Sequence, residues 1–131
     1  MQEFLIKSAN PASSLLFFNK SSDYFAITVE TPTLKATKRV SIYDYVPNNG
    51  FVDFFQILAS HKKPWDGEVI WEPLDGDMTL CATCDPLGHV ELKIVLRNGF
   101  NSSDSWSLEC SISVDFGMLP FHAKEARCFA G

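Results

Sequence analysis

The side chains that could carry covalent, redox or metal chemistry in this chain are four cysteines and three histidines. Cys81 and Cys84 are separated by two residues, a spacing at which paired thiolates bind zinc or cycle through a disulfide. Redox pairs of this kind open a helix, whereas this pair ends a segment with strand alternation, where the two side chains point to opposite faces. We therefore interpret both thiols as structural.

Zinc is the alternative use of this pair, because His89 follows across a turn and could supply a further ligand. A second pair of ligands is missing, since Cys110 and Cys128 are neither close in sequence nor spaced as one. Disulfide frameworks are typical of small secreted chains, and a chain of 131 residues can bury a sizeable core without them. We expect no metal and no cofactor.

Each of the three histidines has a structural explanation. His61 caps the C-terminus of a predicted helix, His89 faces outward beside a turn, and His122 lies in the first turn of the predicted last helix. No serine or cysteine motif near them indicates a nucleophile, and no glycine-rich phosphate loop occurs. The sequence therefore predicts a protein that is not an enzyme.

Negative charge is concentrated in one part of the chain, whose formal net charge is −5. Between residues 64 and 92 there are seven carboxylates and no lysine or arginine. Strand alternation places some of them on an outward face and others at turns, so that one face and its rim carry a negative field. The candidate partner-binding residues are Asp66, Glu68, Glu72, Asp75, Asp77 and Asp85.

Two interpretations of this acidic surface stay open. It can be a solvated face that keeps the protein soluble and protects a sheet edge. It can instead be a docking surface for a basic protein, in which each carboxylate pairs with a lysine or arginine of the partner. The chain's own basic residues form no stripe interleaved with exposed aromatic residues, so we expect no nucleic-acid binding.

Alternation of apolar and polar residues with a period of two predicts antiparallel strands through most of the chain. The C-terminal half is predicted as a four-stranded meander of two hairpins, with strands over Trp65–Trp71, Met78–Cys84, His89–Arg97 and Ser105–Phe116. The N-terminal half offers strands whose pairing order the sequence does not predict, near Glu3–Lys7, Leu15–Phe18, Tyr24–Thr31 and Leu34–Tyr45.

Two segments have helical spacing instead. Gly50 to His61 follows a turn at residues 47–50, and its apolar residues recur every three or four positions: Phe51, Phe54, Phe55 and Leu58. Near Pro120 a short second helix begins, with the apolar stripe Leu119, Ala123, Ala126 and Phe129. The fold class is therefore α+β: one domain over residues 1–131, with a twisted, mostly antiparallel sheet, one helix in the middle and one short C-terminal helix.

The segment that begins the chain lacks the features of a secretory signal, because Lys7, Asn10 and Pro11 interrupt its apolar residues. No uncharged apolar stretch approaches the roughly 20 residues that cross a bilayer. We therefore expect a cytoplasmic protein without a membrane partner.

The C-terminal half also contains a signature of tryptophans, a turn and a strand. It consists of Trp65-x-Gly67, Trp71, Asp85-x-x-Gly88-His89-Val90-x-Leu92, Leu96-Arg97, Trp106 and a closing helix to Phe129. This pattern resembles a family of small uncharacterised bacterial proteins. The resemblance implies a bacterial source and an α+β fold, and it implies no catalytic residues. In size and charge the chain is also similar to immunity proteins, which bind and neutralise a cognate toxin domain.

These observations predict a non-enzymatic binding protein, an immunity protein whose acidic surface neutralises a basic toxin domain such as a nuclease. The alternative is a small-ligand-binding or enzymatic α+β domain with a pocket between sheet and helices. That pocket would be lined by phenylalanines that are more typical of a plain core, namely Phe51, Phe54, Phe55 and Phe121. The partner's identity, the oligomeric state and the exposure of Cys81 and Cys84 stay open.

Overall fold

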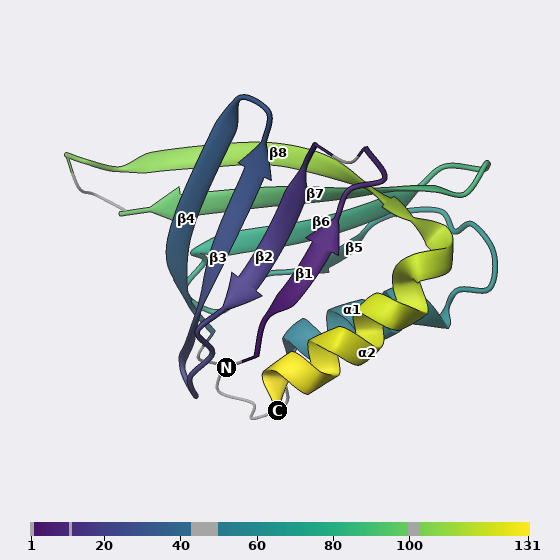
Figure 1. Ribbon diagram of the computed structural model, residues 1–131, viewed down its shortest axis with the longest axis horizontal. Helices are drawn as coiled ribbons and strands as arrows, with labels where there is room; N and C mark the ends of the chain where they lie inside the picture. The colour runs from purple at the N-terminus through teal and green to yellow at the C-terminus, as the bar shows by residue number, and fades with distance from the viewer. Residues whose placement is uncertain (1, 11, 43–49, 100–102) are drawn as a thin grey trace.

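A computed structural model describes residues 2–10, 12–42, 50–99 and 103–131, which form eight strands, two α-helices and one 3₁₀ turn in this part of the chain (Figure 1). The first four strands are β1 (Phe4–Lys7), β2 (Ser14–Phe18), β3 (Tyr24–Thr31) and β4 (Leu34–Ser41). Helix α1 (Gly50–Ser60) precedes β5 (Val69–Trp71), β6 (Met78–Cys84), β7 (His89–Asn98) and β8 (Trp106–Asp115). The 3₁₀ turn η1 (Phe116–Met118) leads into helix α2 (Leu119–Ala130).

The α+β class, the antiparallel hairpins, the middle helix and the C-terminal helix are confirmed. The strands divide into two sheets, however, where the sequence suggested one. Sheet A has the order β1-β2-β3-β4 and sheet B the order β5-β6-β7-β8, each made of neighbours in sequence. Each sheet has one apolar face, and packing the two faces on each other buries both.

The ends of some elements differ from the predicted ones. Strand β4 is assigned to Ser41, and residues 43–49, which include the predicted end of that strand and most of the predicted turn, lie outside the described residues. Strand β5 begins at Val69 instead of Trp65. The Trp65 ring lies in the preceding loop, stacked on the His61 ring with centroids 4.5 Å apart, and both Trp65 and Trp71 pack against the core.

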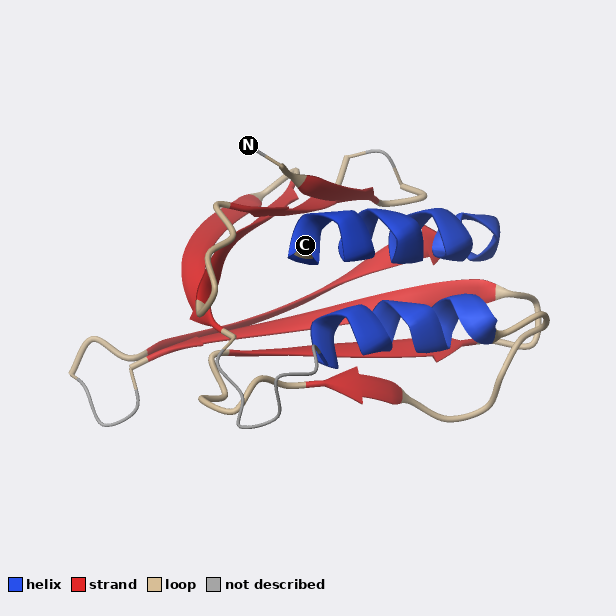
Figure 2. Cartoon of the chain, turned by 90° about the horizontal axis from the view of Figure 1, so that it is seen from below, coloured by secondary structure: helices blue, strands red, loops and turns tan. Residues whose placement is uncertain are grey.

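The two helices fill the open side between the sheets. Sheets A and B cross steeply in Figure 1, and Figure 2 shows α1 and α2 side by side where the sheets diverge. Helix α2 packs on α1 and on β1, and α1 packs on β5. The predicted stripe of α2 is buried, but Phe121 on the same helix is 49% exposed, so it is not a core residue.

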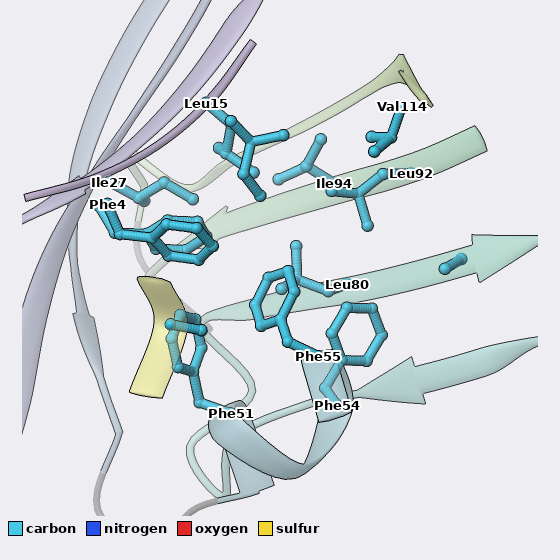
Figure 3. Close-up of a cluster of buried hydrophobic side chains, with 14 of the residues drawn as sticks. Phe4, Leu15, Ile27, Phe51, Phe54, Phe55, Leu80, Leu92, Ile94 and Val114 are labelled. Atoms are coloured by element: carbon cyan, nitrogen blue, oxygen red, sulfur yellow. The ribbon is translucent and has the colours of Figure 1, made fainter. Parts of the chain in front are cut away.

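Phenylalanines from sheet A and both helices form the centre of the core (Figure 3), and aliphatic side chains of sheet B pack against them. The Phe17 ring lies 5.3 Å from the Phe4 ring, 5.3 Å from the Phe25 ring and 5.1 Å from the Phe51 ring, measured between centroids. Most of these pairs have the edge-to-face geometry that aromatic quadrupoles favour. The helical spacing of the phenylalanines in α1 therefore marks a core face.

Candidate binding surfaces

Four of the six predicted partner-binding carboxylates lie beside β5, the edge strand of sheet B. Asp66 and Glu68 precede β5, whereas Glu72 and Asp75 follow it, and all four are exposed. The side chain of Ile70, in the middle of β5, is 58% exposed. We call Asp66, Glu68, Ile70, Glu72 and Asp75 the acidic edge.

The remaining two carboxylates serve the fold. The half-buried Asp77 accepts a hydrogen bond from the Ser41 amide at 3.0 Å, and this bond ties β4 to the start of β6. Asp85 closes the β6–β7 turn by accepting hydrogen bonds from the amides of Leu87 and His89, both at 2.9 Å. The His89 amide and ring hold the pKa of the Asp85 carboxyl below its usual range. A partner would have to compete with these bonds for either residue.

The acidic edge itself contains both paired and free carboxylates. Glu72 accepts a hydrogen bond from Thr79 at 2.8 Å and lies 3.4 Å from the Arg97 guanidinium. Glu68 accepts one from the Cys81 thiol at 3.1 Å. Within the described ranges, Asp66 and Asp75 make no hydrogen bond or ion pair with the protein, so their charges are available to a partner.

The two neighbouring thiols point to opposite faces of β6, as the sequence predicted. Cys81 lies on the outer face opposite Lys93, with 6% of its surface exposed, and Cys84 packs against the core. Burial and the Glu68 carboxylate raise the pKa of the Cys81 thiol to about 11. Among the residues that the structure places, the cysteines are free thiols, and no three metal-ligating side chains are grouped together.

A second surface, which the sequence did not predict, is a groove of about 600 Å³ between the edge of β1 and helix α2. Strand β1 contributes the outward side chains of Leu5 and Lys7, and Glu3 directly precedes the strand. The wall on α2 has residues at helical spacing, and the groove as a whole is lined by Glu3, Leu5, Lys7, Ser8, Ala9, Asp115, Met118, Phe121, His122 and Glu125. We call this feature the β1–α2 groove.

His122 distinguishes this groove from an ordinary surface depression. Its ring is 4% exposed and lines both the groove and a void of about 10 Å³ in the core. The buried Nδ1 atom has no hydrogen-bond partner in the described structure, which is costly for a buried polar atom. Burial lowers the pKa of His122, and this effect outweighs the opposing effect of Glu125. The ring is therefore neutral at neutral pH.

Three of the four phenylalanines that were expected to line a pocket belong to the core. Phe51, Phe54 and Phe55 are buried in the core, and the void beside Phe55 is too small for a ligand. Of the phenylalanines proposed as its lining, Phe121 lines the β1–α2 groove instead.

Two apolar patterns in the sequence correspond to the surfaces around the groove. Strand β2 contains four consecutive apolar residues, so Leu16 and Phe18 place apolar surface on the outer face of sheet A next to Leu5. A second stripe with helical spacing begins just before α2 at Met118 and continues on the helix with Phe121, His122 and Glu125.

Comparison with known proteins adds a family and no function. Residues 6–131 match the model of a family described as "Family of unknown function (DUF6228)". No curated protein and no solved structure matches the chain significantly. None of the helices in the described part of the chain is long and apolar enough to span a membrane.

Proposed function

We propose that this chain, which belongs to this family of unknown function, is a non-enzymatic binding protein that docks a basic protein on its acidic edge. The observation that supports this most is the arrangement around β5, where unpaired Asp66 and Asp75 flank an exposed Ile70. An apolar anchor surrounded by charges that lack partners within the protein is the composition of a polar-rimmed interface.

The charges and the anchor have separate roles in this proposal. Unpaired carboxylates attract a cationic surface over a distance of about one Debye length, roughly 8 Å at physiological salt, and thereby raise the association rate. Ile70 then loses its contact with water on docking and slows dissociation. Both tryptophans that precede and end β5 pack against the core, so they are not the anchors.

The partner class that suits this surface is a toxin domain with a cationic active site. A nuclease needs lysine and arginine side chains to hold the phosphates of its substrate. A protein with free carboxylates at matching spacing can cover those side chains and exclude the nucleic acid. The chain would then act as an immunity protein, which is the function that its size and its net charge of −5 also favour.

A capture experiment at low and at high ionic strength tests the proposal. The tagged chain is used to isolate basic proteins from its native cells, and the purified partner is then assayed for association kinetics and for nuclease activity. In the test variant three of the four charges of the acidic edge are neutralised, by Asp66→Asn, Glu68→Gln and Asp75→Asn, while Glu72 stays paired with Arg97. The control variant loses the same number of exposed charges elsewhere, by Asp23→Asn, Glu30→Gln and Asp53→Asn.

The expected partner is stoichiometric, and the association rate falls about tenfold in the test variant and much less in the control. Equal losses in the two variants would show that net charge alone matters. The absence of any basic partner at either ionic strength would contradict the proposal.

A further inference from the structure

The backbone of β1 is paired on one side only, and its hydrogen-bonding register decides which residues face the other side. Strand β1 is the edge of sheet A, and the Ser8 amide donates to the Ser13 carbonyl at 2.9 Å. Hydrogen-bonded pairs alternate along an antiparallel ladder, so Phe4 and Ile6 bond to β2. The amides and carbonyls of Leu5 and Lys7 therefore point away from β2, toward the β1–α2 groove.

Beyond Lys7 the same edge already has a strand partner. The Ala9 amide, which has the same orientation as those of Leu5 and Lys7, donates to the Ser113 carbonyl of β8 at 2.8 Å. In the described structure the backbones of Leu5 and Lys7 have no corresponding partner outside sheet A. A free row of donors and acceptors beside a cavity is the geometry into which an extended chain can be added.

The side chains around this row are suited to an extended peptide. Leu5 is 42% exposed, and Met118 at the end of η1 and Phe121 on α2 provide further apolar surface in the groove. Glu3, Asp115 and Glu125 bring three carboxylates into the groove against the single ammonium group of Lys7. Successive residues of a strand point to opposite faces, so a segment in which apolar and basic residues alternate can meet both requirements.

We propose that the β1–α2 groove binds an extended peptide segment of a partner protein, with alternating apolar and basic residues, as a fifth strand added to sheet A at Leu5 and Lys7. Helix α2 forms the wall along which this strand lies. A second copy of the chain is a poorer occupant, because its own β1 and α2 would bring the same excess of carboxylates into the groove. This site is independent of the acidic edge.

Fluorescence anisotropy with synthetic hexapeptides tests the inference. The probe alternates valine and arginine, and the matched peptide alternates valine and glutamate. A third peptide has the sequence of the probe but carries N-methyl groups on alternate amides, which blocks hydrogen bonds along one edge. We expect the probe to bind. The affinity of the acidic peptide and that of the N-methylated peptide should each be lower by a factor of about ten or more.

Variants locate the binding. Leu5→Pro removes an amide that makes no bond within sheet A, and Phe121→Ser removes an apolar group from the wall without touching β1. Each substitution is expected to lower the affinity for the probe about tenfold, whereas the variant with Asp66→Asn, Glu68→Gln and Asp75→Asn should bind the probe as the wild type does. Binding that survives N-methylation and Leu5→Pro would overturn strand addition. Failure of the probe to bind, or a dimer of the chain that Leu5→Pro abolishes, would overturn the choice of occupant.

Discussion

The amide nitrogen of Ala9 lies 2.8 Å from the carbonyl oxygen of Ser113, and this hydrogen bond joins sheet A to sheet B. The Ser8 hydroxyl donates to the same oxygen at 3.2 Å. Because β8 is hydrogen bonded to the chain just beyond β1, the unpaired part of the β1 edge is limited to the short stretch beside α2. The proposed peptide site is thus bounded at one end by the protein's own strand.

Hydrogen exchange should reveal the register of β1. The amides of Phe4, Ile6 and Ala9 are hydrogen bonded, whereas those of Leu5 and Lys7 face the groove. In native-state exchange followed by NMR, we expect Leu5 and Lys7 to exchange much faster than their neighbours. Uniform protection along β1 would contradict the derived register.

Thiol alkylation should distinguish Cys81 from Cys128. The thiol of Cys81 has a pKa of about 11, raised by burial and by Glu68, whereas Cys128 is exposed. Since the thiolate is the reactive form, iodoacetamide at mildly alkaline pH should modify Cys128 first and Cys81 last. Glu68→Gln removes the carboxylate charge and should speed modification of Cys81. Peptide mass spectrometry measures both, and an unchanged rate in Glu68→Gln would show that burial alone protects the thiol.

His122 should make the free energy of unfolding depend on pH. Burial lowers its pKa in the folded state below 6.5, so the unfolded chain binds the proton more readily. Stability is therefore fully present above that pH and decreases as the pH falls through and below it. Urea denaturation at a series of pH values should show this slope in the wild type and a weaker slope in His122→Leu. His61→Gln is the control, and an equal loss of slope there would contradict the assignment.

Two phenylalanines should differ sharply in their contribution to stability. Phe17 is buried among five other phenylalanine rings, so Phe17→Ala should lower the free energy of unfolding by about 3–5 kcal/mol. Phe121 is half exposed, and Phe121→Ala should cost less than about 1 kcal/mol while weakening peptide binding. Chemical denaturation measures both values, and similar losses would indicate that Phe121 belongs to the core.

Local patterns in the sequence predicted most elements of the fold, because alternation and helical spacing report which residues share a face. Strands β3 and β6 have the predicted bounds, and α1 differs from its prediction by one residue. The division into two sheets was not predicted, since a strand's alternation defines its buried face and does not identify the element that covers it. The same limit applies to Phe121, which lies beside the buried stripe of α2.

The candidate sites show a similar limit. The outward phase of β5 correctly placed Glu68 and Glu72 on the surface. Their partners, Cys81 on β6 and Arg97 on β7, depend on the register between strands, which a single sequence does not supply. The β1–α2 groove requires residues from opposite ends of the chain, so no local pattern could have assembled it.

The position of α2 has a consequence for how the chain acquires its structure. Each sheet consists of consecutive hairpins and can form from local contacts, which favours fast pairing. Phe129 near the end of α2 nevertheless packs against Phe4 of the first strand, with ring centroids 6.5 Å apart. During synthesis sheet A leaves the ribosome long before α2, and until then its apolar face lacks the helix that completes its cover. Completion of the core therefore waits until α2 has been synthesised, and until then the exposed apolar face of sheet A is prone to aggregation.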